Sequence, residues 1–382
     1  MIDSFQGRLA VQQRLLPIYR APFFETLANA CPRGLSVFAG DVSSRESIPV
    51  THQLANAKFY LAHNHHLGEI HSPFYLLWQG GLLDWLSSWD PAVLIIEANP
   101  RYVSTRRGVS WMHHRNRPVI GWGLGAAGNP IQKNVRGWLD RFQDRVRQNF
   151  LLSLDAMIAY SQRGALEYQQ QGVARERIFV APNAVVSRPT QPPPQRAATF
   201  QGRAKLLFVG RLQARKRIDN LFAACSALAE PIQPEITVVG DGPVKAELEA
   251  QAKTVYPRAH FTGDLRGEAL SEQFRQADLF VLPGSGGLAV QEAMSYALPV
   301  IVAEGDGTQS DLVRPENGWQ VKPGDRLALQ SVLSSALLDP AQLRKMGAAS
   351  YRIVAEEINL ESMVATFIEA VTYAQSARNV TR

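Results

Sequence analysis

The chain has few of the features that mark secreted, membrane-spanning or disulfide-rich proteins. It holds 382 residues but only two cysteines, Cys31 and Cys225, which lie far apart in the sequence and so indicate two buried thiols, not a disulfide scaffold. Its start lacks a basic region followed by an apolar one, so no secretory signal is visible. No stretch approaches the roughly 20 apolar residues that a spanning helix needs. We expect a cytoplasmic protein.

The histidines are poorly placed to hold a metal. His65–His66 and His113–His114 are adjacent pairs, and neighbouring side chains on a helix or strand point apart. No carboxylate or third histidine stands at ligand spacing beside them. We therefore expect neither a metal nor another cofactor.

The composition is that of a globular α/β protein. Of the residues, 46% are hydrophobic and 19% charged, and the length exceeds one ordinary core, so two domains of roughly 180 residues each are expected. Short apolar strands alternate with helices, which is typical of a parallel sheet covered on both faces. Strands are predicted at 8–12, 35–39, 93–96, 118–122, 156–160, 178–180, 236–239, 279–282 and 300–302 and from residue 205, and helices at 23–30, 132–150 and 353–376.

A proline-rich stretch divides the two halves. Residues 187–195 read Ser-Arg-Pro-Thr-Gln-Pro-Pro-Pro-Gln, which can form neither a helix nor a central strand and therefore predicts a semi-rigid linker. The predicted fold class is α/β, with two Rossmann-like doubly wound domains facing a central cleft as the default site. The predicted parts are 1–186, a linker at 187–204, a second domain at 205–352 and a terminal helix within 353–382.

The first candidate motif is a glycine followed by two cations. Gly210 and Arg211 end a predicted strand, and Lys216 lies at the expected start of the next helix. Glycine lets a ligand approach the backbone, arginine can pair with two phosphate oxygens, and lysine adds a mobile point charge. A surface cluster is the alternative for this pair alone, and the neighbouring Arg215 and Arg217 leave the phosphate ligand ambiguous.

The second candidate motif is a glycine loop that opens a helix. Gly284-Ser285-Gly286-Gly287 follows an apolar strand, and the helix begins at Leu288. Backbone N–H groups and the dipole at such a start bind anions. Glu292 falls one to two turns into that helix, where its carboxylate could accept both ribose hydroxyls or merely complement the dipole.

Two further strand ends complete the set. Gly240-Asp241-Gly242-Pro243 is a turn with Pro at the first position of a helix, so its primary role is structural. His260-Phe261-Thr262-Gly263 ends a strand where a nucleotide base could lie, with Thr262 and Gly263 offering backbone contacts.

Together the four motifs predict a nucleotide-sugar site, because parallel α/β sheets bind ligands at strand-to-helix turns. Arg211, Lys216 and the N–H groups of Gly287 and Leu288 would hold the diphosphate, and Glu292 the ribose.

Positive charge gathers in one segment of the first half. Residues 101–149 hold ten Lys/Arg and two acidic residues within a chain of net charge +6. Such a segment attracts lipid headgroups, polyprenyl diphosphates or nucleic acid, but no nucleic-acid recognition motif accompanies it. Peripheral contact with the inner face of the cytoplasmic membrane is one interpretation, aided by exposed aromatics at Phe74, Tyr75 and Trp138. A solvated helix face is the other.

These motifs resemble those of the retaining glycosyltransferases of family 4, which have the two-Rossmann-domain fold called GT-B. The resemblance covers nearly the whole chain and is strongest from Lys205 to Asp325. Family members carry Gly-Arg-Leu and a following Lys, here Gly210-Arg211-Leu212 and Lys216, and Gly-Asp-Gly-Pro, here at 240–243. Further similar stretches lie at 17–20, 181–184, 316–319 and 323–325. The resemblance implies that 1–186 is the acceptor side, that 205–352 binds the donor, and that the terminal helix crosses back to the first domain.

The chain departs from the family pattern at two positions. The family's paired glutamates are eight positions apart; the second is Glu292, but Gly284 holds the first position. Sugar recognition would then fall to the backbone of residues 284–286, to Ser285, or be less strict. Many members also have a histidine where Leu124 stands. Its part would be absent or taken by Glu97, Asn99 or Arg101 at the preceding strand end.

The resemblance implies a metal-independent hexosyltransferase. It would move a sugar from a UDP- or GDP-sugar to a glycan or polyprenyl-diphosphate or other lipid-linked acceptor, as in bacterial polysaccharide, lipopolysaccharide or glycolipid assembly. Arg211, Lys216 and Glu292 would be its catalytic residues, with no side-chain nucleophile. Two alternatives stay open: a non-catalytic nucleotide-sugar or glycan binding protein, and a sugar-nucleotide 2-epimerase, which would want acid and base side chains over the sugar.

Overall fold

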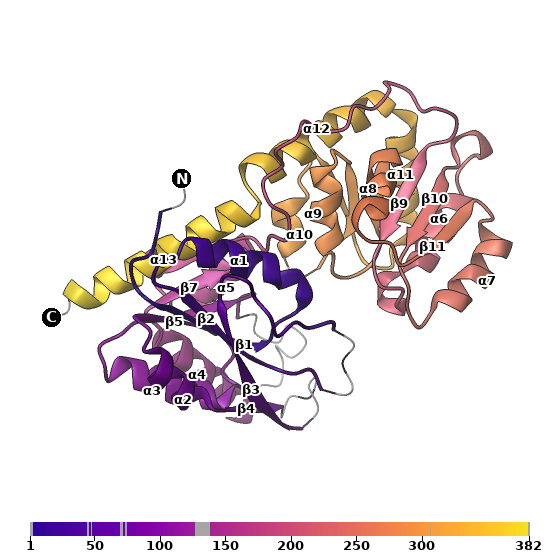
Figure 1. Cartoon of the computed structure of the whole chain (residues 1–382). Coiled ribbons are helices and arrows are strands. Elements are labelled where there is room, and N and C mark those ends of the chain that lie inside the picture. Colours follow the sequence, from indigo (N-terminus) through magenta and orange to yellow (C-terminus); the bar gives the residue numbers. More distant parts are fainter. Residues whose placement is uncertain are drawn as a thin grey trace. The chain divides into compact units, whose positions relative to one another are not determined.

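The computed structural model describes residues 3–43, 46, 48–68, 72, 75–126, 138–305 and 307–380. It divides the chain into two compact units (Figure 1). The first comprises Met1–Asn183 with Leu360–Arg382, and the second comprises Ala184–Asn359. Each unit is an α/β structure built on its own sheet.

The first unit is built on an eight-stranded sheet in the order β4-β3-β2-β1-β5-β6-β7-β8. The inner strands β2, β5 and β7 are almost wholly buried and mostly apolar, as expected of parallel strands covered on both faces. Strand β1 is buried as well, although its second half reads Gln12-Gln13-Arg14. The strands are β1 Leu9–Leu15, β2 Leu35–Gly40, β3 Lys58–Leu67, β4 Leu76–Gly80, β5 Val93–Glu97, β6 Val119–Gly123, β7 Ala156–Ala159 and β8 Ile178–Val180.

The prediction of a parallel sheet is wrong at one edge. Strand β4 pairs antiparallel with β3, and neither strand stands out in the sequence. Strand β3 carries three histidines and an asparagine and is mostly exposed or half-buried. Strand β4 is the edge strand and β3 is its neighbour. Strands at or next to the edge of a sheet need little apolar surface, so neither one leaves a long apolar run in the sequence.

Helices cover the first sheet, including one from the far end of the sequence. Helix α13 packs on α1 and on strands β6, β7 and β8 (Figure 1). Its Phe367 ring lies 4.8 Å from the ring of Phe23 and 4.9 Å from that of Trp122. The helices are η1 Ile18–Arg20, α1 Ala21–Asn29, α2 Leu82–Trp89, α3 Val103–His113, α4 Trp138–Leu152, α5 Gln162–Gln170, η3 Arg175–Arg177 and α13 Leu360–Val380.

The second unit is built on six parallel strands in the order β11-β10-β9-β12-β13-β14. The strands are β9 Lys205–Val209, β10 Glu235–Val239, β11 Ala259–Gly263, β12 Leu279–Leu282, β13 Val300–Ala303 and β14 Gly318–Val321. The helices are η4 Ala214–Lys216, α6 Ile218–Ser226, η5 Glu230–Ile232, α7 Lys245–Val255, α8 Gly267–Gln276, α9 Leu288–Ser295, α10 Thr308–Leu312, α11 Arg326–Leu338 and α12 Pro340–Glu356.

The proline-rich segment packs on the second unit. Arg196 donates hydrogen bonds to the carbonyl oxygens of Ala277 at 2.7 Å, Tyr296 at 2.8 Å and Phe274 at 2.9 Å. These acceptors are neutral, and burial lowers the pKa of Arg196 to about 10. The segment predicted as a linker is therefore anchored at residue 196 to the body that follows it.

The predicted terminal helix is two helices that belong to different units. Helix α12 ends at Glu356 and α13 begins at Leu360. The buried Asn359 lies between them and donates to the carbonyl oxygen of Val354 at 2.8 Å. A side-chain amide that satisfies the last carbonyls of a helix favours a stop there.

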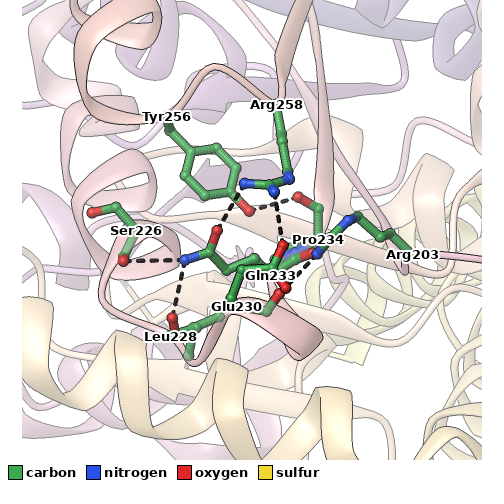
Figure 2. Close-up of polar contacts among 8 residues, drawn as sticks. All are labelled: Arg203, Ser226, Leu228, Glu230, Gln233, Pro234, Tyr256 and Arg258. Atoms are coloured by element: carbon green, nitrogen blue, oxygen red, sulfur yellow. Dashed lines mark hydrogen bonds and ion pairs between the residues drawn. The ribbon is translucent and has the colours of Figure 1, made fainter.

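A polar network ties together the amino-terminal ends of β9, β10 and β11 (Figure 2). The Glu230 carboxylate accepts from Arg203 and from Arg258, the latter at 3.0 Å, and Arg258 also donates to Gln233 at 2.9 Å. The Tyr256 hydroxyl donates to the carbonyl oxygen of Pro234 at 2.6 Å. The amino-terminal ends of these strands are thus joined by internal bonds. The loops of the candidate site lie at the carboxyl-terminal ends.

Each sheet has one point where the strand order reverses. In the first unit it lies between β1 and β5, and in the second between β9 and β12. Loops at the carboxyl ends of the two strands diverge there, which makes such points the usual ligand sites of doubly wound sheets.

Candidate functional site

The two principal predicted motifs meet where the strand order of the second unit reverses. Lys216 ends the short helix η4 after β9, and its Nζ donates to the carbonyl oxygen of Ser285 at 2.8 Å, in the loop after β12. Its side chain is buried, with the residue 8% exposed. Burial, and then the neighbouring Arg215, lower the pKa of Lys216 to about 8. Burial removes water from the ammonium group, so a bound anion would stabilise its charged form.

The loop after β12 packs directly on the backbone beside Lys216. A Cβ on Gly284 would lie 2.2 Å from the carbonyl oxygen of Arg215 and 2.4 Å from the carbonyl carbon of Lys216. Ser285 N–H donates to the same Arg215 oxygen at 3.1 Å. The position where the family has a glutamate therefore has no room for any side chain in this structure.

Ser285 and Gly286 lie against the two cations. The Ser285 hydroxyl accepts from the Arg215 guanidinium at 3.1 Å. A Cβ on Gly286 would be 3.3 Å from Lys216 Nζ and 3.6 Å from an Arg215 nitrogen. Sugar recognition by residues 284–286 stays a prediction, and the hydroxyl of Ser285 already has a partner.

Helix α9 begins directly beyond this loop. Gly287 occupies the cap position with φ of 149° and provides no side-chain cap; a Cβ there would lie 2.3 Å from Leu282 Cδ2. The first amides of the helix, starting at Leu288, follow residues that contact Lys216. The lysine charge and the positive end of the helix dipole thus favour an anion at one place.

Glu292 lies in the second turn of α9 and is half-buried. Burial raises the pKa of its carboxyl group, and the described part of the chain offers it no hydrogen-bonding or ionic partner. Its neighbour Gln291 is buried and fixes the helix by accepting from Val185 N–H at 2.7 Å and donating to the Ile358 carbonyl oxygen at 2.6 Å. The helix that carries Glu292 is therefore fixed, and the carboxylate has acceptor capacity to spare.

Arg211 stands at the end of β9 and is exposed. Its neighbour Gly210 lies against the Lys216 side chain, because a Cβ on Gly210 would be 4.0 Å from Lys216 Cε. The two predicted phosphate cations thus follow the same strand, one exposed and one buried.

The turn at 240–243 is packed on the turn at 210–212. A Cβ on Gly240 would lie 2.1 Å from the Gly210 oxygen, and one on Gly242 would lie 2.2 Å from the Leu212 oxygen. This close approach supports the structural interpretation of the turn. Pro243 is not at the first helical position, however, because Val244 caps α7 and the helix begins at Lys245.

The expected base site lies at the end of β11. The Gly263 oxygen accepts from Gly240 N–H at 2.8 Å, and the Thr262 hydroxyl is 3.1 Å from that oxygen. Lys245 Nζ would be 3.9 Å from a Cβ on Gly263 and pairs with Asp241 at 3.1 Å. Sequence reasoning missed Lys245, which stands at the first position of α7 and pairs with Asp241 of the preceding turn.

The first unit has a cavity of about 640 Å³ where its own strand order reverses. The predicted acceptor-side residues Glu97, Asn99 and Arg101 all line it. Glu97 accepts from the backbone N–H of Arg14 at 2.7 Å, and burial raises the pKa of its carboxyl group. Leu124, which stands at the histidine position, lines the same cavity and is 50% exposed.

Several arginines of the basic segment that the structure describes already have partners. Arg117 pairs with Asp90, and Arg115 stacks on Trp111, its guanidinium carbon 3.8 Å from the ring centroid. Arg106 and Arg107 also lie over aromatic rings. Lys133, Arg136, Phe74 and the side chain of Trp138 lie outside the described residues.

The expected exposed aromatic at Tyr75 is wrong. Its residue is 4% exposed, and its hydroxyl is 2.8 Å from His66 Nδ1. Packing with Leu77 and Tyr102 buries the ring.

The described residues hold neither a metal-binding cluster nor a membrane-spanning helix. No group of three or more His, Cys, Asp or Glu side chains there could hold a metal ion. Within the same residues, every helix is too short or too polar to cross a membrane.

Comparison with known proteins links the second unit to one family. Residues 193–353 match the family described as glycosyl transferases group 1. A GDP-mannose-dependent alpha-mannosyltransferase of Mycolicibacterium smegmatis is 39% identical over 117 residues, 30% of this chain and 29% of that protein. The sulfoquinovosyl transferase SQD2 of Arabidopsis thaliana is 36% identical over 126 residues, 31% of this chain and 24% of that protein. The chain thus spans less than a third of these relatives.

Solved structures share the fold of both units. Anabaena HepE in complex with UDP has a TM-score of 0.68 at 15% identity, covering 96% of this chain and 100% of that one. Sucrose-phosphate synthase from Thermosynechococcus elongatus has a TM-score of 0.68 at 18% identity, covering 97% of this chain and 100% of that one. The predicted GT-B fold class is confirmed.

Proposed function

We infer that this chain, whose residues 193–353 match the glycosyl transferases group 1, transfers a sugar from a nucleotide diphosphate sugar to a glycan or lipid-linked acceptor. We further propose that the reaction retains the anomeric configuration and needs no metal ion. Bacterial polysaccharide, lipopolysaccharide or glycolipid assembly is the setting in which such an acceptor would occur.

The position of Lys216 carries this proposal. A buried ammonium group contacts the loop that opens α9, at the point where the strand order reverses. Glu292, with no partner among the described residues, lies in the second turn of that helix. A cation, free helix amides and a carboxylate are the groups that a diphosphate and a ribose require.

The relatives support a nucleotide-sugar donor. One is named as GDP-mannose-dependent, and the Anabaena structure contains UDP. We propose UDP- or GDP-sugars as donors, with Thr262 and Gly263 beside the base. A Corynebacterium glutamicum relative named as a phosphatidylinositol monomannoside mannosyltransferase supports a lipid-linked acceptor.

The proposed mechanism needs no side-chain nucleophile. Arg211, Lys216 and the N–H groups of Gly287 and Leu288 stabilise the charge that develops on the leaving diphosphate. The acceptor hydroxyl bonds to the anomeric carbon from the leaving-group face as the bond to the diphosphate oxygen breaks. Its proton passes to a phosphate oxygen, and the configuration is kept.

A thermal-shift screen with UDP-, GDP-, ADP- and TDP-sugars tests the donor. A ligand that binds only the folded chain raises the melting temperature, and we expect this for one nucleotide with the native chain and a much smaller shift with Lys216→Ala. If Lys216→Ala left both donor affinity and turnover unchanged, the diphosphate assignment would be wrong.

Product analysis tests the reaction itself. We expect NMR of the glycoside to show the anomeric configuration of the donor, and we expect turnover to persist in EDTA. An inverted product or a metal requirement would contradict the respective part of the proposal.

Two other functions make different predictions. A non-catalytic binding protein would bind donor without hydrolysing it, even over long incubation. A 2-epimerase would return a nucleotide sugar changed at C2 in the absence of acceptor. Slow donor hydrolysis without acceptor, with no epimer formed, favours the transferase.

Peripheral membrane contact through the first unit is a further part of the proposal. Co-sedimentation with vesicles that contain anionic lipid should exceed that with neutral vesicles and should fall with added salt. Equal recovery with both would leave the basic segment as an ordinary solvated surface.

A further inference from the structure

We propose that the cavity of the first unit binds a phosphate-type anionic group of the acceptor, and that Arg20 is the residue that holds it. That the bound group belongs to an acceptor rests on the proposed transferase function. The binding of the anion itself does not depend on that function and can be measured separately. Arg20 is distinct from the three acceptor-side residues expected from the sequence, Glu97, Asn99 and Arg101.

Arg20 is a buried cation whose hydrogen-bonding capacity is only partly used. It ends helix η1 directly after β1 and lines the cavity, and the residue is 6% exposed. One terminal nitrogen donates to the Tyr160 hydroxyl at 3.0 Å. The other, Nη1, is buried with no hydrogen-bond partner among the described residues. A buried charged donor without a partner is costly, so the site favours a ligand that supplies an acceptor.

Aromatic rings hold the guanidinium in place. Its central carbon lies 4.9 Å from the ring centroid of Trp122, 5.2 Å from that of Tyr160 and 5.8 Å from that of Tyr19. Trp122 is in turn packed on Phe367 of α13. Because the group is already oriented, little conformational freedom is lost when it binds a ligand.

The charges around the cavity favour an anion. Four arginines line it, and Glu97 is the one acidic residue among its described lining. Arg14 already has a partner, Glu46, at 2.8 Å. Glu97 accepts from the Arg14 N–H and from the Tyr102 hydroxyl, and among the described residues it forms no ion pair with Arg20. Arg20 and Arg101 thus have charge to offer an incoming group.

The ligand class follows from these groups. A guanidinium pairs with two oxygens of a phosphate in a fixed geometry. Tyr19 and Leu124, 45% and 50% exposed, add apolar surface beside the charge. A cavity of about 640 Å³ has the size of a small-ligand site, so a sugar phosphate or the first part of a polyprenyl diphosphate fits its volume.

Calorimetry on the full chain tests the site with three probes: inorganic pyrophosphate, glucose 6-phosphate and farnesyl diphosphate. The donor site in the second unit can also bind a diphosphate, so each probe is measured on Lys216→Ala as well. We expect at least one probe to bind Lys216→Ala as tightly as the native chain and to bind Arg20→Gln about tenfold more weakly or worse. UDP affinity should be unchanged in Arg20→Gln.

The probes also distinguish the source of the phosphate. A soluble sugar phosphate predicts that glucose 6-phosphate binds more tightly than pyrophosphate. A lipid carrier predicts that farnesyl diphosphate binds more tightly than pyrophosphate.

Two results would overturn the proposal. Binding of all probes that is lost in Lys216→Ala and kept in Arg20→Gln would assign the anion to the donor site. Unchanged probe binding with a lower melting temperature in Arg20→Gln would make Arg20 a packing residue only.

Two further variants serve as controls for an effect on folding. Arg20→Lys keeps the charge but loses the planar fork, so it should fold and bind the successful probe several-fold more weakly; equal affinity would contradict the assigned geometry. Arg115→Gln removes an arginine stacked on Trp111 elsewhere in the same unit and should change neither binding nor folding.

Discussion

At the scale of single residues, Lys216 should make donor binding depend on pH. Its pKa in the ligand-free protein is about 8, and only the charged form attracts the diphosphate. We expect donor Kd to be constant below about pH 7 and to rise above pH 8 by up to about tenfold per pH unit. Calorimetry between pH 6.5 and 9 measures this, and Lys216→Met should give weak binding with no such rise.

The same lysine has the opposite effect on folding. Its pKa is lower in the folded chain than in the unfolded one, so between pH 8 and about 10 the unfolded chain binds more protons. Its contribution to the free energy of unfolding therefore increases with pH in this range. If donor affinity falls with pH while the free energy of unfolding contributed by Lys216 rises, Lys216 is the group responsible. General unfolding at high pH would instead lower both the affinity and the free energy of unfolding.

Glu292 should show a similar conflict between binding and stability. Glu292→Gln removes a half-buried charge that has no described partner. We expect donor Kd to rise about 10- to 100-fold, since hydrogen bonds to a charged group are lost, with a melting temperature equal to or above that of the native chain. Glu247→Gln, at an exposed position of α7, is the control and should change neither. A fall in stability together with unchanged Kd would remove Glu292 from the donor site.

At the scale of elements, what the sequence predicts depends on how much an element must bury. Central strands such as β9 and β12 are predicted because both faces of a parallel sheet demand an unbroken apolar run. Strand β3 escapes prediction because its place near the edge demands no such run. The division between α12 and α13 also escapes, because it depends on the buried amide of Asn359.

The candidate site was predictable in its motifs but not in its contacts. The spacing of glycines and cations indicated both loops, yet the packing of Gly284 on Arg215 joins residues 69 apart in the sequence (284 against 215). Arg20 was missed for the same reason. Its burial and its unused donor arise from Trp122 and Tyr160, which no local pattern connects with it.

The close packing of these loops makes Gly284 sensitive to any side chain. In Gly284→Ala the new methyl group would meet the backbone of Arg215 and Lys216, and backbone cannot rotate away as a side chain can. We expect a loss of about 1–3 kcal/mol in the free energy of unfolding and weaker donor binding, because Lys216 is displaced. Denaturant unfolding and calorimetry measure the two effects.

Gly267→Ala is the matched control for this prediction. Gly267 has φ of 53°, and a Cβ there meets nothing within 4 Å. Only backbone strain of about 1 kcal/mol is expected, with unchanged donor affinity. If Gly284→Ala behaved in the same way, the loop after β12 would have room that the structure denies it.

At the scale of the whole molecule, the last helix of the sequence completes the first unit. Helix α13 follows the entire second unit in the chain but packs on α1 and on β6 to β8. The first unit therefore cannot complete its packing until α13 has been synthesised, whereas the second unit is one continuous segment. Substitutions in α13 should act on one unit alone.

Phe367→Ala tests this division. Its ring is fully buried among Phe23 and Trp122, so its removal should cost about 3–5 kcal/mol and lower the unfolding transition of the first unit only. Calorimetric scans identify the second unit by the rise of its transition with bound nucleotide. Tyr256→Phe removes a hydroxyl bound to Pro234 in the second unit. It should lower the free energy of unfolding of the second unit by about 1 kcal/mol and leave the transition of the first unit unchanged. If either variant shifted both transitions together, the two units would unfold as one cooperative body.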